Sequence, residues 1–249
     1  MPKSKKVFMC KECGSESPKW MGQCPVCGEW NSLTEEVISK DKSSRSPINK
    51  TNGKGGSKPK PISEISNEQN DRKNLQDNEL NRVLGGGLVH GSVVLFGGDP
   101  GIGKSTLMLQ VALLNKDLIT VYVTGEESEQ QIRMRAERLG MDNTSCYIFT
   151  ETSTQNIFQH LEKMNPGLLV IDSVQTMHTD RVDSSPGSIS QIRESAGEFL
   201  RYAKETSTPV FLIGHITKEG NIAGPKLLEH MVDTVLQFEG DQNHIYRLL

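Results

Sequence analysis

Residues 97–108 read GGDPGIGKSTLM, and this stretch decides the fold. Within it, the pattern G-x-x-x-x-G-K-S runs from Gly98 to Ser105. The apolar residues 93–96 precede the pattern, and residues 106–114 follow it with the spacing of an apolar helix face. A strand, a glycine-rich turn and a helix in that order form the context in which this pattern becomes a P-loop. The stretch therefore predicts a nucleoside triphosphate site on an α/β fold; a glycine turn beside a chance Lys-Ser pair is the alternative.

The residues of the predicted loop have separate tasks. Glycines adopt positive φ angles without strain, so backbone N–H groups can close around phosphate oxygens. The positive end of the following helix adds to the attraction. Lys104 is expected to contact the β- and γ-phosphates and to take part in catalysis, and Ser105 to offer its hydroxyl to Mg²⁺. The expected nucleotide contacts of the loop are Gly98, Asp99, Pro100, Gly101, Ile102, Gly103, Lys104, Ser105 and Thr106.

Acidic residues follow two other apolar runs. Asp172 ends a continuous apolar run that is typical of a strand buried on both faces. Because ligands bind at the carboxyl edge of such sheets, Asp172 is expected to hold Mg²⁺ together with Ser105. Glu126 and Glu127 follow the β-branched run 118–124, where a carboxylate can orient the attacking water or accept its proton. Glu126 is the first choice as catalytic residue and Glu127 the second, although both would also favour a helix N-terminus.

Four of the five cysteines form two C-x-x-C pairs, each followed by a glycine. They are Cys10, Cys13, Cys24 and Cys27. Two such pairs at this separation indicate a tetrahedral, all-thiolate structural zinc site, whereas a redox pair would need only one. The segment is too short to build a core, so zinc is expected to supply its folding free energy. Trp20 and Trp30 are expected to cover the site, with stacking on a base or a partner as the alternative.

Composition narrows the class of protein. The chain of 249 residues has a net charge of −3, but residues 1–60 hold 12 Lys or Arg against 6 Asp or Glu. Such a basic arm suits either nucleic-acid contact or a solvated tail. No apolar run approaches the length of a membrane span, and no signal-type apolar core follows Met1. We therefore expect a cytoplasmic protein without membrane contact, in which thiols stay reduced.

Three segments of the chain differ in composition. Residues 1–34 hold the cysteine pairs, and residues 35–78 are rich in Ser, Lys, Asn, Gly and Pro. Because the second segment has almost no large apolar residues, it is expected to be a flexible linker. Residues 79–249 alternate between strand-like and helix-like runs, which predicts a mainly parallel sheet covered by helices on both faces. Strands are expected at 93–96, 118–124, 146–149, 168–172 and 210–214, and helices at 80–84, 106–114, 128–139, 154–163 and 190–205.

Two polar segments follow predicted strands. The segment 215–225 begins with His215, which at a strand end would lie near enough to the γ-phosphate to sense it. It holds two glycines and a lysine, so it suits either contact with a nucleic-acid backbone or a plain surface connection. Residues 178–188 form a second long polar loop, and long loops within compact domains tend to be functional.

Taken together and in order, these motifs resemble the RadA (Sms) family of bacterial DNA-repair proteins, within the RecA-like ATPase superfamily. The resemblance rests on the four-cysteine ribbon, the linker, and the runs LNRVLGGGLVHGSVVLFGGDPGIGKSTL, TGEES, LLVIDSVQTM and GHITKEGNIAGPKLLEHMVDTVLQFEGD. It implies a RecA-like P-loop ATPase core after the zinc ribbon, and a homo-hexamer in the full-length protein. It also implies a DNA-dependent, helicase-like ATP hydrolase that acts in recombinational DNA repair and drives branch migration on single-stranded DNA.

The resemblance also assigns residues, cofactors and partners. It matches Lys104, Ser105 and Asp172 to positions that bind ATP and Mg²⁺, and Glu126 to the catalytic glutamate of RecA-like motors. The segment from His215 takes the place of a sensor strand that leads into a DNA-contacting loop, and residues 178–188 take the place of the other DNA loop. The implied partners are single-stranded DNA, branched recombination intermediates, the replicative helicase and the recombinase. The expected DNA contacts are Lys218, Asn221 and Lys226.

The family continues past a strand like IYRLL into a Lys-Asn-Arg-Phe-Gly segment and a Lon-protease-like scaffold domain, whereas this chain ends at Leu249. A fragment without that domain is expected to be mostly monomeric, to bind ATP with Mg²⁺ and to hydrolyse it slowly. A signalling or clock-type RecA-like ATPase that acts on proteins is the alternative, because paired glutamates follow this strand there too. The third interpretation is a zinc-bearing adaptor in which the ATP site is only a conformational switch.

Overall fold

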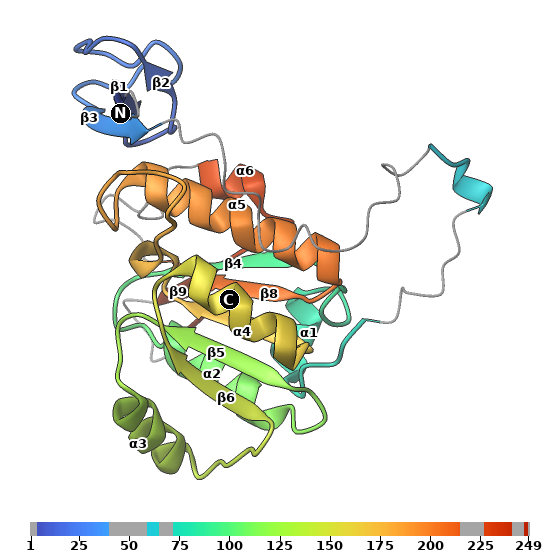
Figure 1. The fold of residues 1–249 in the computed structure, drawn as a ribbon. Helices are drawn as coiled ribbons and strands as arrows, with labels where there is room; N and C mark the ends of the chain where they lie inside the picture. Colours follow the sequence, from blue (N-terminus) through green and yellow to red (C-terminus); the bar gives the residue numbers. More distant parts are fainter. Residues whose placement is uncertain (1–3, 40–58, 65–71, 215–226, 241–246, 249) are drawn as a thin grey trace.

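The computed structural model of the protein describes residues 4–39, 59–64, 72–214, 227–240 and 247–248 (Figure 1). Two sheets form within these ranges. A three-stranded sheet lies in the N-terminal segment that holds the cysteine pairs, and a seven-stranded sheet forms in the rest of the chain. The division into a small ribbon and a larger α/β body follows the change in composition along the sequence.

The large sheet has the strand order β10-β9-β4-β8-β7-β5-β6. Its strands are β4 (Val93–Gly98), β5 (Thr120–Thr124), β6 (Cys146–Thr150), β7 (Leu168–Asp172), β8 (Val210–Ile213), β9 (Thr234–Gly240) and β10 (Arg247–Leu248). All neighbouring strands run parallel except β10, which pairs antiparallel with β9. Every residue of β4, β5, β7 and β8 is buried, as their apolar runs require. The predicted α/β fold with a mainly parallel sheet is therefore confirmed.

Helices cover both faces of this sheet (Figure 1). They are α1 (Asn78–Val83), α2 (Lys104–Leu114), α3 (Glu129–Leu139), α4 (Thr154–Met164), α5 (Ile189–Thr206) and α6 (Leu227–Met231). One apolar layer joins the sheet to α4, α5 and α6, and the other joins it to α1, α2 and α3. Since strand side chains alternate, Val121 and Val123 of β5 enter the first layer and Tyr122 enters the second.

Two short 3-10 turns complete the described elements, η2 (Ile62–Glu64) and η3 (Val174–Thr176). Turn η3 follows β7 after a single residue, Ser173, next to the strand end that carries Asp172. Local signals set the helix after β5: Ser128 and Gln131 form a reciprocal capping box at the start of α3, and Gly140 ends it in the left-handed conformation. This cap explains why α3 begins directly after the two glutamates.

The ribbon sheet consists of β1 (Ser4–Cys10), β2 (Glu16–Ser17) and β3 (Leu33–Ser39), in the order β2-β1-β3. All pairs are antiparallel, and β3 pairs with β1 along its whole length. The structure therefore continues regular pairing to Ser39, beyond residue 34, where the composition suggests that the ribbon ends. The sequence does not reveal this strand, because it carries charged residues where an apolar pattern would be expected. One of them, Glu35, forms an ion pair with Lys6 of β1 across the sheet.

The body also begins earlier than composition indicates. Leu75 is fully buried against α1 and α2, and Lys73 pairs with Leu88 through backbone hydrogen bonds in both directions. A single leucine within a polar run does not produce a periodic pattern, so sequence reasoning assigns it to the linker. The remaining linker residues lie largely outside the described ranges. Strand β9 and helix α6 are not predicted, since their short runs alternate with polar residues, whereas β10 lies within the IYRLL run that the family resemblance gives as a strand.

Candidate functional site

The predicted nucleotide residues meet at the carboxyl edge of the large sheet. The P-loop follows β4, Glu126 and Glu127 follow β5, and Asp172 ends β7. Thr124, the last residue of β5, is the register partner of Asp172. The backbone N–H of Gly125 then donates to the carbonyl oxygen of Asp172 at 3.0 Å. Parallel register therefore brings the acidic residues of two strands to one place.

The P-loop has the backbone shape that its glycines predict. The φ angles of Gly98, Gly101 and Gly103 are 154°, 78° and 112°. A Cβ atom at Gly98 would lie 2.6 Å from the carbonyl oxygen of Phe238 in β9, so a side chain has no room there. Within the described part of the chain, the N–H groups of Gly103 and Lys104 donate to no protein acceptor. They stay available to phosphate oxygens at the N-terminus of α2.

Lys104 lies across the mouth of this loop and is buried. Its Nζ donates hydrogen bonds to the carbonyl oxygens of Gly98, at 2.5 Å, and Asp99, at 2.9 Å. Burial lowers the pKa of Lys104, and the carboxylates of Asp172, Asp99 and Glu126 oppose that shift. The ammonium group is thus held at the centre of the predicted site, surrounded by acceptors and acids.

Asp172 is buried, and its two carboxylate oxygens have different surroundings. Oδ2 accepts a hydrogen bond from the hydroxyl of Tyr122, while Oδ1 is buried without a hydrogen-bond partner among the described residues. Burial raises the pKa of Asp172, and the charges of Glu126 and Glu127 act in the same direction. The hydroxyls of Tyr122 and Ser105 oppose the rise, so the Ser105 side chain faces this carboxylate. A buried carboxylate oxygen beside a hydroxyl is the donor set that Mg²⁺ prefers.

The two glutamates after β5 have different partners. Their backbone N–H groups both donate to Oγ1 of Thr124, which turns the chain at this point. The side chain of Glu126 accepts a hydrogen bond from the hydroxyl of Ser173, the residue after Asp172. The side chain of Glu127 forms an ion pair with Arg135 of α3 instead. Glu126 therefore points toward the end of β7, and Glu127 toward α3.

The turn between β5 and the glutamates has no space for a side chain. A Cβ atom at Gly125 would lie 2.4 Å from Oγ1 of Thr176 and 2.7 Å from a methyl group of Thr152. The Thr176 hydroxyl itself donates to the carbonyl oxygen of Ser173 at 2.8 Å. The turn that carries the glutamates is therefore packed directly against the turn that follows Asp172.

The structure describes one of the two segments predicted to contact DNA. His215, Lys218, Asn221 and Lys226 lie outside the described residues. The loop 178–188 is described, and Gln191 of α5 anchors it by donating to the carbonyl oxygens of residues 179, 182 and 184. Arg181 of the same loop forms an ion pair with the buried Glu198, with an Nε–Oε1 distance of 2.7 Å. Sequence reasoning missed both anchors, because nothing in a helical pattern shows which polar residues face a loop.

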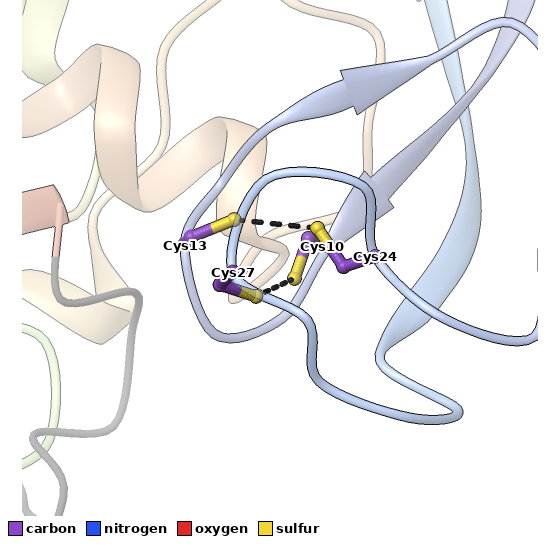
Figure 2. A group of neighbouring side chains, drawn as sticks. All are labelled: Cys10, Cys13, Cys24 and Cys27. Carbon is purple, nitrogen blue, oxygen red and sulfur yellow. Dashed lines mark hydrogen bonds between the residues drawn. The ribbon is translucent and has the colours of Figure 1, made fainter.

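The four cysteine sulfurs lie within 4.8 Å of one another. Figure 2 shows the side chains pointing toward one another, with Sγ–Sγ distances of 3.6 Å for Cys10–Cys27 and for Cys13–Cys24. Four thiolates about 2.3 Å from a tetrahedral zinc would be about 3.8 Å apart. The spacing of the sulfurs therefore fits one zinc ion.

The turns that follow Cys10 and Cys24 have the same backbone hydrogen bond and the same type of glycine conformation. Gly14 donates its N–H to the carbonyl oxygen of Cys10, and Gly28 to that of Cys24, both at 2.9 Å. Both glycines have positive φ angles, 67° and 76°. Although burial acts to raise it, backbone N–H groups and the Ser15 hydroxyl lower the pKa of Cys24 to about 6. Burial and the three neighbouring cysteines instead raise the pKa of Cys27 to about 12, so the environment favours the metal-binding thiolate at Cys24 and not at Cys27.

The prediction that Trp20 and Trp30 cover the metal site is wrong. Their exposed fractions are 57% and 67%, and the small core beside the sulfurs consists of the buried Cys10, Cys24 and Leu33 with partly buried neighbours. Both tryptophans lie outside this small core and stay in solvent. Apolar character alone therefore misled the sequence reading.

Comparisons with known proteins agree with this architecture. The family model described as "AAA domain" matches residues 59–221, and the one described as "Rubredoxin metal binding domain" matches residues 8–35. The chain is 52% identical to the DNA repair protein RadA of Halalkalibacterium halodurans over 252 residues. It is 49% identical to that of Bacillus subtilis and 48% to that of Pseudomonas aeruginosa. These matches cover 100% of the chain and 55% of each relative, so the chain spans about half the length of the curated relatives it matches.

A solved structure is similar in fold. The KaiC-like protein PH0186 of Pyrococcus horikoshii superposes with a TM-score of 0.56 at 20% identity, over 71% of this chain and 85% of that protein. In the part of the chain that the structure describes, no helix is both long and apolar enough to cross a membrane. The chain belongs to the AAA domain family, and its similarity to the DNA repair protein RadA over its whole length confirms the resemblance that its motifs indicate.

Proposed function

We propose that the protein is a DNA-dependent ATPase of recombinational DNA repair. The observation that carries the proposal is the meeting of Lys104, Glu126 and Asp172 at one sheet edge, within reach of each other's charge. The relatives that match the whole chain are named DNA repair proteins, which supports the biological setting. ATP with Mg²⁺ is the ligand that this set of residues suits.

The residues divide the work of phosphate binding. The free N–H groups at the start of α2 and the ammonium group of Lys104 hold the phosphate oxygens. The Ser105 hydroxyl and Oδ1 of Asp172 hold Mg²⁺, which would neutralise the charge that develops on the phosphates. Residues 98–106 surround the nucleotide, and His215 would report on the γ-phosphate from the end of β8.

Glu126 is our choice for the catalytic carboxylate. Its side chain accepts a hydrogen bond from Ser173, and its negative charge acts to raise the pKa of Lys104. In this position it would face the phosphates and could orient the attacking water or accept its proton. Glu127 Oε1 is paired with Arg135, and both side chains are mostly buried, so this oxygen is engaged in structure, while Oε2 is buried without a hydrogen-bond partner among the described residues. The contacts thus support different roles for two adjacent residues of the same type.

The finer activity follows from the family resemblance. We propose that a full-length hexamer drives branch migration on single-stranded DNA in the cytoplasm, with Lys218, Asn221 and Lys226 on the DNA backbone. The replicative helicase and the recombinase are the proposed protein partners. Zinc, held by the four cysteines, folds the ribbon and takes no part in the chemistry, because four thiolates fill its coordination shell.

An ATPase assay tests this proposal. The protein, in a form as long as its curated relatives, is assayed for phosphate release from ATP with and without single-stranded DNA. We expect Mg²⁺-dependent turnover that rises with DNA, and loss of turnover in Glu126→Gln. Turnover that DNA does not change, together with phosphate transfer to a protein, would favour the signalling-type ATPase instead. Binding of ATP without any turnover would favour the adaptor.

A further inference from the structure

Tyr122 lies in the middle of β5 and has no exposed surface. Its ring packs in the apolar layer between the sheet and helices α1, α2 and α3, where a phenylalanine ring would fill the same space. A buried hydroxyl costs free energy unless it finds a partner. The hydroxyl of Tyr122 donates its hydrogen bond to Oδ2 of Asp172, on the neighbouring strand β7.

The position of this hydroxyl links two parts of the nucleotide site. Its oxygen also lies 3.4 Å from the backbone carbonyl oxygen of Ser105, in the first turn of α2. Tyr122 therefore stands between the strand that carries Asp172 and the helix that carries Ser105. These are the two residues whose side chains would hold Mg²⁺.

The hydrogen bond also makes the two oxygens of Asp172 unequal. Oδ2 is occupied by the phenol, whereas Oδ1 makes no hydrogen bond within the described residues. The terminal torsion of an aspartate is broad, so an unsupported carboxylate samples many orientations. Partners that fix the orientation of a metal ligand typically change metal affinity by about 10–100-fold when they are removed.

We propose that Tyr122 is a positioning residue for magnesium: its hydroxyl holds Asp172 so that Oδ1 faces the Ser105 hydroxyl and the divalent cation of a bound nucleotide. The inference rests on the proposed function, since it requires a magnesium nucleotide at this edge of the sheet. It adds a residue that lies below the site and that no nucleotide-binding pattern in the sequence includes. Tyr122 acts through Asp172 and touches neither nucleotide nor metal.

A merely structural hydroxyl would behave differently. Its loss would lower the stability of the fold but leave the dependence of nucleotide binding on Mg²⁺ unchanged. Tyr202 offers the matched control, because it is another buried tyrosine, on α5 in the opposite apolar layer. Tyr122→Phe and Tyr202→Phe each remove one buried hydroxyl and keep the ring, so both variants keep their packing.

The experiment measures binding of the fluorescent nucleotide mant-ADP to the purified protein as MgCl₂ is titrated, and again in EDTA. For Tyr122→Phe, we expect the Mg²⁺ concentration at half-maximal effect to rise about 10–100-fold. Affinity for mant-ADP in EDTA should stay at the wild-type value. Tyr202→Phe should leave both quantities unchanged, and thermal unfolding checks that each variant is folded.

A second variant, at Asp172, tests the proposal independently of Tyr122→Phe alone. Asp172→Asn should weaken the same Mg²⁺ effect, and adding Tyr122→Phe to it should cost nothing more, because Tyr122 acts only through that carboxylate. An unchanged Mg²⁺ titration in folded Tyr122→Phe, or losses that add in the double variant, would overturn the positioning role and leave the proposed function standing. A wild-type protein that binds mant-ADP equally with and without Mg²⁺ would overturn both.

Discussion

The metal site and the nucleotide site of this molecule are assembled over different distances along the chain. The four sulfurs come from residues 10–27 and lie within 4.8 Å of one another. Lys104, Glu126 and Asp172 come from three separate segments and meet because β4, β5 and β7 end at one edge of a parallel sheet. The first site depends on local spacing and a metal, and the second on the register of a whole domain.

The two regions also differ in what stabilises their folds. The ribbon buries few apolar residues, namely Val7, Met9, Cys10, Cys24 and Leu33, which is too little apolar surface for a stable core without the metal. The body buries two extensive layers, one on each face of its sheet. The Ser190 hydroxyl of α5 donates a hydrogen bond to Glu36 of β3, but the buried apolar cluster of the ribbon is separate from those of the body. The two regions should therefore lose their structure independently, and damage to one site should leave the other intact. Four substitutions test the two sites and the segment after β8, in order of decreasing effect.

Cys24→Ser should have the largest effect, because it removes one of four zinc ligands. Structural zinc contributes about 10–16 kcal/mol of apparent binding free energy in small metal-folded domains, and most of it should be lost. We expect one zinc per chain in the wild-type protein and almost none in the variant, as measured by atomic absorption. The far-UV signal of the ribbon should be lost, while the thermal transition of the body stays in place.

The fifth cysteine provides the control. Cys146 lies on β6, outside the group of four, so Cys146→Ser should keep the zinc. Iron instead of zinc in the purified protein would correct the identity of the metal, since four thiolates also hold iron. A Cys24→Ser protein that retains its metal, or whose body also melts, would contradict the independence of the two regions.

Glu126→Gln should have the second largest effect, on the rate of ATP hydrolysis. A general base contributes about 10²–10⁴-fold to a rate, and glutamine keeps the shape of the side chain while losing the carboxylate. ATP affinity should stay near the wild-type value, as measured by equilibrium binding. Glu127→Gln is the matched control and should retain most of the rate, because that side chain is paired with Arg135. The opposite pattern in these two variants would assign catalysis to Glu127.

Lys104→Ala should weaken ATP binding by about 10–100-fold, the loss expected when one hydrogen bond to a charged group is removed. The ammonium group is buried among acceptors of the loop, where the phosphates are proposed to bind. Lys116 lies just past the end of α2 and is exposed, and Lys116→Ala should bind ATP normally. Calorimetric titration with a slowly hydrolysed ATP analogue measures both variants. Equal affinities would show that Lys104 lies outside the phosphate contacts.

The same difference in assembly decides how far the sequence can predict each site. The cysteine ligands and the P-loop are local patterns, so their residue numbers follow directly from spacing. Asp172 and the glutamates could be located at strand ends, because a parallel sheet collects those ends at one edge. The partners of these acids could not be predicted, since Tyr122 and Ser173 contact them only through the register of β5 with β7.

The errors of sequence reasoning have physical causes as well. Trp20 and Trp30 were expected over the metal because large apolar side chains usually seek cover, but a ribbon this small cannot bury them. The ribbon was expected to end at residue 34, whereas β3 continues to Ser39, because its Glu35 pairs with Lys6 across the sheet and leaves no apolar pattern in the sequence. In both places, the small amount of surface that the ribbon can bury decides which side chains are exposed, and the usual burial preference of each residue type does not.

Lys218→Ala should have the smallest effect, and it extends the comparison to a segment that follows β8. β8 lies between β4 and β7 in the sheet, so the segment from residue 215 leaves from the edge that carries the nucleotide site. A lysine that neutralises one phosphate should reduce the salt dependence of single-stranded DNA binding by about one charge, with little change in sequence preference. Nucleotide affinity without DNA should not change. Fluorescence anisotropy with a labelled oligo(dT) at several salt concentrations gives the slope.

Lys163→Ala is the control, because that exposed lysine lies in the last turn of α4, before β7 begins, at the opposite edge of the sheet. If the two variants have the same slope as the wild-type protein, the segment after β8 is a surface connection, and DNA contact must be sought elsewhere on the chain.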